Sequence, residues 1–146
     1  MGGVAGNRLA KQLCRGFAVA ASLLFQSPLA SAQDMEGFRS PTGNIQCLFF
    51  DDSSVRCMVG ETANPRPARP PDCELDWGSD FGLDASSRRG ERLCVGDTIA
   101  GDYEALPYGE SVRRGGITCS SERTGVTCIN ERGAGFELSR ARQRLF

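Results

Sequence analysis

The chain of 146 residues contains no histidine and a single lysine, Lys11. Histidine is the most frequent general base and metal ligand in proteins, so its absence excludes Ser-His-Asp and Cys-His nucleophile pairs. The sequence also lacks a phosphate-binding glycine loop, a dinucleotide-binding fingerprint and a nucleophile elbow. Aromatic residues make up only 8% of the chain. We therefore predict that the protein is not an enzyme and uses no cofactor.

No apolar run in the sequence is long enough to cross a bilayer core of about 30 Å. A short apolar run, GFAVAASLL at 16–24, follows basic residues and precedes small residues at 30–32. This order is typical of a secretory signal peptide, and the alternative is an uncleaved membrane anchor. We predict cleavage after Ala32, a single domain over residues 33–146, and a secreted or periplasmic protein without a transmembrane segment.

Cleavage would leave fourteen basic residues, all of them arginine, against eighteen acidic residues. Lysine-based Schiff-base chemistry is therefore excluded from the exported chain. Residues 33–110 carry a net charge of −8, whereas residues 111–146 carry a net charge of +4. Because nucleic-acid binding depends on neutralising phosphates, the overall acidity argues against a nucleic-acid partner.

Two pairs of strand-like runs surround short clusters of turn-forming residues. The first pair spans 45–50 and 54–59, and the second spans 117–121 and 126–130. Both pairs repeat the order glycine, isoleucine, cysteine, valine, cysteine, which indicates two related hairpins. Residues 60–72 contain four prolines and are predicted to form a surface loop. No segment has sustained helical periodicity, so the fold is predicted to be mostly β, a small disulfide-stapled sandwich or partly open barrel built from hairpins.

Six cysteines follow the predicted cleavage site, and an even number in a short exported chain indicates a disulfide framework. They are Cys47, Cys57, Cys73, Cys94, Cys119 and Cys128. A zinc site is the alternative, but zinc ligands come in pairs two to four residues apart, and the closest cysteines here are nine apart. We predict bonds between nearest neighbours, because each hairpin then places its two cysteines on facing strands. Bonds between the two hairpins remain the alternative.

Several segments resemble a family of small secreted bacterial disulfide-rich domains of unknown function. The resemblance is carried by FRSPTGNIQC (38–47), VRC (55–57), DWG (76–78), CVGDT (94–98), LPYGESVRRGGITCSSERTGVTC (106–128) and GFELSRARQRLF (135–146). It covers essentially all of the predicted exported chain. It implies export and one disulfide-rich domain, and it implies no particular activity.

Five arginines are candidates for binding an anionic partner, because guanidinium groups bind carboxylates and phosphates in a bidentate manner. They are Arg113, Arg114, Arg140, Arg142 and Arg144. The last three alternate in sequence, so a strand there would align them as one cationic ridge, with the first two expected nearby. The alternative is a charged edge strand that is solvated or pairs with the domain's own acidic residues.

Trp77 and Tyr108, together with Tyr103, are candidates for an aromatic platform that binds sugars, although such residues more often fill a small core. Acidic residues alternate at Asp72, Glu74 and Asp76, as they would on one face of a strand that binds calcium. An EF-hand loop starting at Asp72 is excluded, since its sixth and twelfth positions are not glycine and glutamate. We therefore predict no metal ligands, and a solvated acidic loop in their place.

The sequence favours a non-enzymatic binding or interaction domain in the periplasm or outside the cell. An anionic envelope polysaccharide or an acidic protein surface is the expected partner. The first alternative is a protein inhibitor of a hydrolase, which would present the loop over 60–72 as a rigid contact. The second is a small hydrolase that uses two carboxylates, for which histidine is not required.

Overall fold

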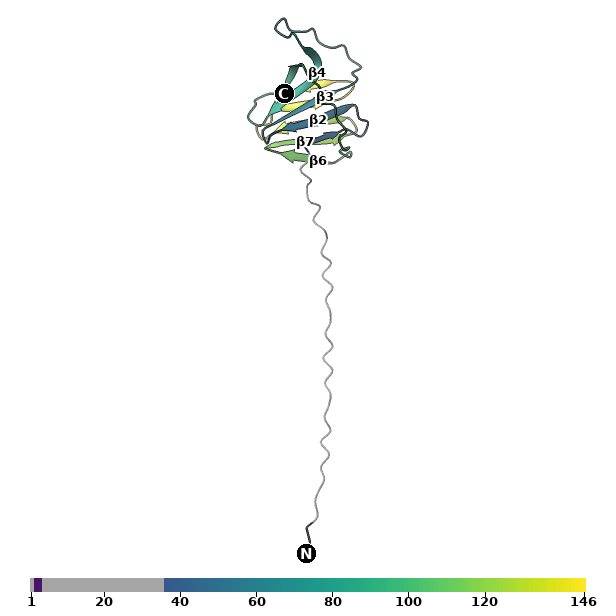
Figure 1. The fold of residues 1–146 in the computed structure, drawn as a ribbon, viewed down its shortest axis with the longest axis vertical. Helices are drawn as coiled ribbons and strands as arrows, with labels where there is room; N and C mark the ends of the chain where they lie inside the picture. The colour runs from purple at the N-terminus through teal and green to yellow at the C-terminus, as the bar shows by residue number, and fades with distance from the viewer. Residues whose placement is uncertain (1, 4–35) are drawn as a thin grey trace. The chain divides into compact units, whose positions relative to one another are not determined.

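The computed structural model describes residues 2–3 and 36–146, and the second range forms ten β-strands (Figure 1). The strands are β1 (Gly37–Arg39), β2 (Ile45–Phe50), β3 (Ser54–Val59), β4 (Asp76–Asp84), β5 (Glu91–Val95), β6 (Ser111–Arg114), β7 (Ile117–Glu122), β8 (Gly125–Asn130), β9 (Gly135–Leu138) and β10 (Gln143–Leu145). The described residues include no helix, so the predicted mostly β fold is confirmed.

The strands form two antiparallel sheets of five, and each sheet follows the order of the chain. The first sheet is β1-β2-β3-β4-β5 and the second is β10-β9-β8-β7-β6. Strand β4 of the first sheet packs against β8 and β9 of the second, so that the two sheets enclose a common core. The sandwich prediction is therefore confirmed, whereas the sheets do not close into a barrel.

The two predicted hairpins form at the expected places, one in each sheet. Strands β2 and β3 have the predicted bounds, and the three residues that join them include Asp51 with a φ of 51°. Strands β7 and β8 are each one residue longer than predicted, and a two-residue turn joins them. A Cβ at Gly125 would collide with the carbonyl oxygen of Leu138, and its φ is +141°, so only glycine suits this position.

All three predicted disulfides are present: Cys47–Cys57, Cys73–Cys94 and Cys119–Cys128. The first and third join directly opposed residues of the two hairpins, with Cα atoms 4.0 and 4.1 Å apart. Such short distances are typical of the closer spacing in an antiparallel ladder. Nearest-neighbour pairing is confirmed, and bonds between the hairpins are not present in this structure.

The core consists of side chains that alternate inward along the strands, as period-two burial requires. The two hairpin disulfides lie at its centre and are fully buried. Phe81 pairs with Cys57 in the first sheet and Phe136 pairs with Cys128 in the second, and the two rings meet across the core at 6.3 Å. The two sheets thus repeat one pattern of disulfide and neighbouring phenylalanine.

Polar contacts also join the two sheets at their ends. Asn130 is buried, and its amide nitrogen donates to the carbonyl oxygens of Asp84, at the end of β4, and of Ser87, in the turn that follows. Its side-chain oxygen accepts from the backbone of Ala134 in the turn after β8. Both the nitrogen and the oxygen of the Asn130 side chain therefore have hydrogen-bond partners, as a buried amide requires.

The predicted loop at 60–72 contains no strand and is mostly exposed. Its first part is anchored on the C-terminal segment: the backbone nitrogen of Ala63 donates to Arg140, and the amides of Asn64 and Gln143 pair at 3.0 and 3.1 Å. The disulfide at Cys73 holds its other end. The loop is therefore fixed at both ends.

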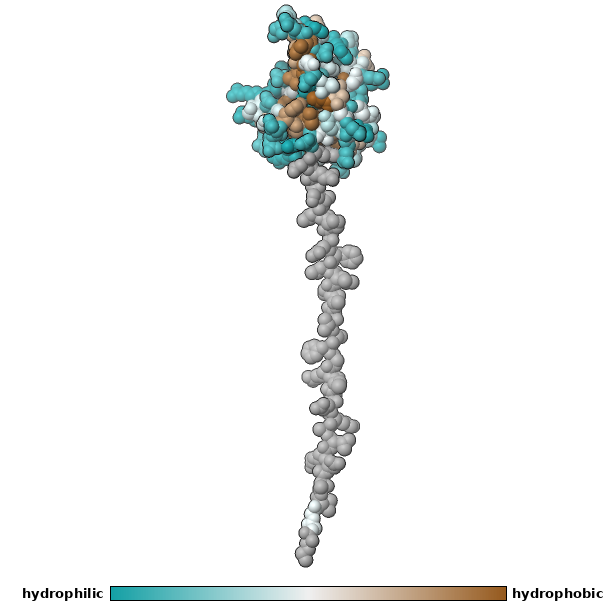
Figure 2. Space-filling view, viewed as in Figure 1, coloured by the Kyte–Doolittle hydropathy of each residue, from teal (hydrophilic) through white to brown (hydrophobic). Residues whose placement is uncertain are grey.

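The predicted signal peptide and Cys14 fall outside the described residues. The compact unit that holds the ten strands spans Ala32–Phe146. Among the described residues, no helix is long and apolar enough to cross a membrane. Figure 2 shows that apolar residues gather toward the middle of one face of this unit, with hydrophilic residues around them.

Candidate functional site

The five candidate arginines do not form one ridge. Arg113 and Arg114 lie on β6, which is at the opposite edge of the second sheet from β10. Arg113 pairs with Glu131 at 2.5 Å, and Arg114 pairs with Asp52 at 3.0 Å. The expectation that these two arginines would join the C-terminal ones is therefore wrong, because the sheet order separates them by its full width.

The C-terminal strand is shorter than the alternation of arginines suggested. Strand β10 includes Arg144, whereas Arg140 and Arg142 lie in the turn that joins β9 to β10. Ser139 fixes this turn, because its backbone nitrogen donates to the carbonyl oxygen of Arg142 at 2.9 Å and its hydroxyl accepts from the backbone nitrogen of Arg142 at 3.0 Å. The turn therefore displays two arginines, and the strand holds the third.

The three C-terminal arginines differ in how tightly they are held. Arg144 makes two hydrogen bonds to Glu137, at 2.5 and 3.0 Å, which lower the pKa of Glu137 and raise that of Arg144. Arg142 lies 3.9 Å from the same carboxylate, and Arg140 lies 3.7 Å from Glu61. The side chains of Arg140 and Arg142 are 70% and 75% exposed. These two guanidinium groups are therefore the available ones.

Five parts of the chain surround a cleft of about 630 Å³ at one end of the sandwich. Three are the turns that join β1 to β2, β7 to β8 and β9 to β10, while Glu61 comes from the loop after β3 and Tyr108 from the segment before β6. The cleft brings together two predicted site residues, Tyr108 and Arg140. The guanidinium of Arg123 lies 5.1 Å from the centre of the Tyr108 ring. A cleft of this volume is in the range of small-ligand sites.

A second hollow of about 300 Å³ adjoins the cleft, because Thr124, Gly125 and Ser139 line both. Arg142 and Glu137 lie on its border. The two hollows together form one elongated site, which we call the end groove. Its rim is rich in hydroxyl and amide groups, contributed by Ser40, Thr42, Asn44, Thr124, Thr127 and Ser139.

The three aromatic candidates do not form one platform. Tyr108 lies in the end groove and is 37% exposed. Tyr103 packs against Gly37 and Gly101, and its hydroxyl donates to the carbonyl oxygen of Ile99 at 2.8 Å. Trp77 is half-buried on β4 opposite Cys94, with its indole nitrogen buried and bonded to no described residue. Of these residues, only Tyr108 belongs to the groove.

Arg123 joins Tyr108 in the groove, although sequence reasoning assigned it only to a turn. Arg123 and Tyr108 are well separated in the sequence, so their spacing does not reveal that they are in contact. The signal that could have found it is the hairpin itself: the turn after β7 must lie near the segment that enters β6, because β6 and β7 are neighbours. The backbone nitrogen of Gly109 indeed donates to the carbonyl oxygen of Ser121 at 2.7 Å.

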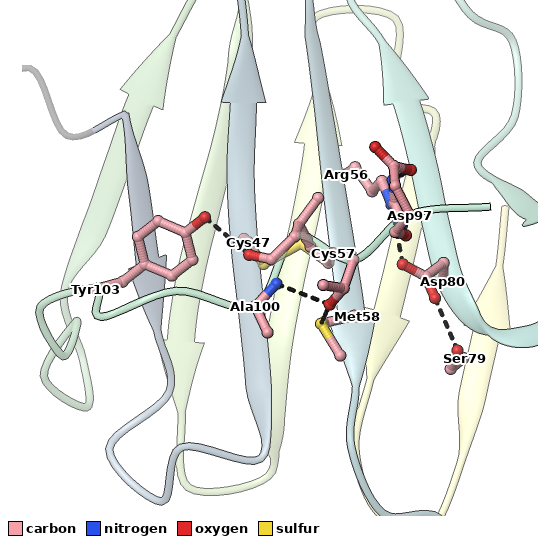
Figure 3. Close-up of polar contacts among 11 residues, drawn as sticks. Cys47, Arg56, Cys57, Met58, Ser79, Asp80, Asp97, Ala100 and Tyr103 are labelled. Atoms are coloured by element: carbon pink, nitrogen blue, oxygen red, sulfur yellow. Dashed lines mark hydrogen bonds and ion pairs between the residues drawn. A yellow bond between two sulfur atoms is a disulfide. The ribbon is translucent and has the colours of Figure 1, made fainter. Parts of the chain in front are cut away.

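A buried charge cluster on the outer face of the first sheet was also missed. Arg56 is 8% exposed and contacts Asp80, which is 5% exposed, at 2.9 Å (Figure 3). Its other nitrogens donate to the side chain and backbone of Asp97 at 3.0 and 2.6 Å. Burial opposes the charge, but the bonds to Asp97 and Asp80 outweigh it and raise the pKa of Arg56. The sequence carries no signal for this burial, because Glu137 on β9 also lies between two buried residues and is not itself buried.

The segment after β5 covers this cluster. Figure 3 shows the chain from Asp97 to Tyr103 crossing the outer face of the first sheet, over the strands that carry Arg56 and Cys47. Thr98 contacts the sulfur of Met58 at 3.8 Å, and the backbone nitrogen of Gly101 donates to Gln46 at 3.0 Å. The cluster therefore fastens a covering segment to the sheet.

Among the described residues, one group of three side chains has metal-ligand atoms that all lie within 4.8 Å of one another, and it consists of core cysteines. These are Cys47, Cys57 and Cys128, and all three sulfurs are in disulfides. Asp72 and Glu74 precede β4, so they do not alternate on a strand with Asp76. Asp72, Glu74 and Asp76 are all exposed residues.

No curated protein and no solved structure matches the chain. A family does match: residues 18–146 fit the pattern described as "Family of unknown function (DUF6636)". The match includes all ten strands, all six disulfide-bonded cysteines and the end groove. The chain therefore belongs to this family of unknown function.

Proposed function

We propose that the protein is an exported, non-enzymatic binding domain that takes an anionic polysaccharide into the end groove. The observation that carries the proposal is the convergence of Tyr108, Arg140 and Arg142 on one elongated concave site. A sugar ring can stack on an exposed aromatic ring, while the hydroxyl-rich rim offers partners for its hydroxyl groups. An acidic protein surface is the other partner that the arginines could bind. A concave site, however, suits a polymer chain better than the broad face of a protein.

The two available arginines can change partners at low cost. Exposed ion pairs contribute about 0–1 kcal/mol, so a ligand carboxylate can replace Glu61 or Glu137 as the partner of Arg140 or Arg142. The new contact would be a charge-assisted hydrogen bond, which is stronger when ligand and guanidinium meet in a bidentate manner. Arg144 is held by two hydrogen bonds and is not expected to change partners.

The acidic residues of the groove restrict the ligand further. Glu61, Glu122 and Glu137 line it together with the arginines, so the site carries charges of both signs. A polymer with closely spaced phosphates or sulfates would meet these carboxylates and be repelled. A sugar chain with one carboxylate per unit places its charges singly, and it is the ligand class that this pattern favours. The same argument disfavours nucleic acid.

The double variant Arg140→Gln, Arg142→Gln is expected to bind polygalacturonate at least about tenfold more weakly than the wild type, since each charge-assisted hydrogen bond is worth about 1.5–3 kcal/mol. Binding by the wild type should fall with added salt, because exposed charges are screened. Calorimetry or retention on the immobilised polymer measures both effects. The melting temperature should change little, because only exposed pairs are lost.

Arg113→Gln is the matched control, because it removes an exposed, ion-paired arginine at the opposite edge of the same sheet. It should leave polymer binding unchanged. Neutral dextran should not bind, and densely charged dextran sulfate should bind less well than polygalacturonate. Equal binding by the double variant and the control would refute the groove as the site. If the polymer does not bind and an acidic protein is captured instead, an acidic protein surface would be favoured as the partner.

A hydrolase is the second candidate, because Glu61 and Glu122 line the same cleft. Both are exposed, however, and a carboxylic acid that protonates a leaving group needs an environment that keeps it protonated. The binding function is therefore favoured. Incubation with polygalacturonate should release no new reducing ends. Release that is abolished by Glu61→Gln or Glu122→Gln alone would establish the enzyme instead.

An inhibitor is supported by one feature, the proline-containing loop that is fixed at both ends. Residues 65–71 are mostly exposed and lie between these anchors, so the middle of the loop is accessible to a partner. A hydrolase inhibitor would form a complex of fixed stoichiometry that depends on this loop and not on Arg140 or Arg142. The groove variants therefore separate this function from polymer binding.

Export is expected to yield a chain that begins at Gln33. The three disulfides support this proposal, because such bonds form and persist in oxidising compartments. Expression in a bacterium followed by intact-mass measurement of the periplasm and medium tests the cleavage site. Exported material that retains Cys14 would contradict the prediction.

A further inference from the structure

The two core disulfides touch each other across the sandwich. The sulfur of Cys57 in the first sheet lies 3.9 Å from the sulfur of Cys128 in the second. This is van der Waals contact between atoms of two separate covalent links. Cys47 completes a group of three sulfurs within 4.8 Å of one another, whereas Cys119 lies outside it. Cys57 and Cys128 are therefore the pair from opposite sheets that is poised to react.

We propose that Cys57 and Cys128 are a latent inter-sheet disulfide, formed by exchange when the Cys47–Cys57 bond is opened. A dithiol reductant that reaches this bond when the domain opens supplies two electrons, is itself oxidised to a disulfide, and leaves Cys47 and Cys57 as thiols. The Cys57 thiolate then attacks the sulfur of Cys128, and Cys119 departs as a thiolate that takes up the proton lost by Cys57. One bond within each sheet is thereby replaced by a single bond between the sheets.

The surroundings confine the exchange to the core cysteines. All four sulfurs are fully buried, so the Cys57 thiolate meets no other disulfide in the folded core. The remaining disulfide, Cys73–Cys94, lies apart from the core, and Cys94 is exposed. The contact thus forms a redox-sensitive switch: the oxidised core staples each hairpin separately, and the half-reduced core links the two sheets.

The double variant Cys47→Ala, Cys119→Ala, made as the full exported chain, retains only the two touching cysteines in the core. We expect peptide mapping after alkylation to find them joined, with no free thiol at either position. The matched control Cys57→Ala, Cys128→Ala retains Cys47 and Cys119, and we expect both to be alkylated. Alkylated Cys57 and Cys128 in folded double variant would overturn the proposal.

The single variant Cys47→Ala decides the matter if the double variant does not fold. It keeps the Cys119–Cys128 bond and presents the Cys57 thiol to it. We expect a mixture in which part of the folded protein has the Cys57–Cys128 bond and a free Cys119. If all of the folded single variant retains Cys119–Cys128 and a free Cys57, no exchange occurs and the proposal fails.

Discussion

Complete reduction of the three disulfides is expected to unfold the domain at room temperature. The bonds close segments with sequence separations of 10, 21 and 9 residues. Bonds that close loops of this size each restrict the unfolded chain by about 3 kcal/mol. Their sum approaches the whole free energy of unfolding of a typical domain, about 5–15 kcal/mol. The small core between two five-stranded sheets leaves little reserve against that loss.

The three bonds should not be reduced together. Cys94 is exposed, whereas Cys47, Cys57, Cys119 and Cys128 are fully buried, so a reductant reaches the core bonds only when the domain opens. We expect Cys73–Cys94 to react first in native buffer, with partial loss of stability. The core bonds should follow at the rate of opening, and added denaturant should accelerate them.

Timed alkylation and peptide mapping measure this order, and circular dichroism with and without prior reduction in denaturant measures the stability. Thiol titration of the unfolded, unreduced chain should find no free thiol among the six cysteines. Loss of the core bonds before Cys73–Cys94 would contradict the burial argument. A fully reduced domain that melts within a few degrees of the oxidised one would contradict the stability argument.

The hairpins could be predicted because their signals are local. Each has turn-forming residues between two runs of alternating apolar residues, and the cysteines fall on facing positions only in this register. Strand β4 could not be predicted in the same way, because glycine and aspartate interrupt its sequence, DWGSDFGLD. Its neighbours β3 and β5 hold it in place, with a bulge between Trp77 and Phe81. Pairing within the sheet overrides weak local preference here.

The site was less predictable than the fold, because it depends on where the turns meet. The arginines were identified by charge alone, which cannot reveal that Arg144 is held by Glu137 or that β6 and β10 are opposite edges. The alternating arginines suggested a longer C-terminal strand than β10, which spans only Gln143–Leu145. The end groove combines five separate parts of the chain, and no spacing in the sequence brings them together.

Arg56→Met is expected to lower the free energy of unfolding by about 3–5 kcal/mol, the usual cost of leaving one member of a buried ion pair without its partner. The remaining member is Asp80, which is 5% exposed. Ser79 would still donate to the second carboxylate oxygen of Asp80 at 2.7 Å, but it brings no compensating charge. The covering segment would also lose both of its bonds from Arg56 at Asp97.

Asp97→Asn is the matched control for the covering segment. The side chain of Asp97 is 84% exposed, so removing its charge should cost about 1 kcal/mol or less. Its backbone oxygen would still accept from Arg56. Urea unfolding of the two variants should therefore separate the buried pair at Asp80 from the exposed pair at Asp97. Equal losses in both variants would mean that burial does not decide the strength of this cluster.

The double variant Arg56→Met, Asp80→Asn tests the reason for the loss. Because it removes the uncompensated charge, it should be more stable than Arg56→Met alone, although it lacks both charged groups. Urea denaturation of the two variants measures this difference. A double variant less stable than Arg56→Met would show that the cluster stabilises the sheet through packing and hydrogen bonds instead of charge compensation.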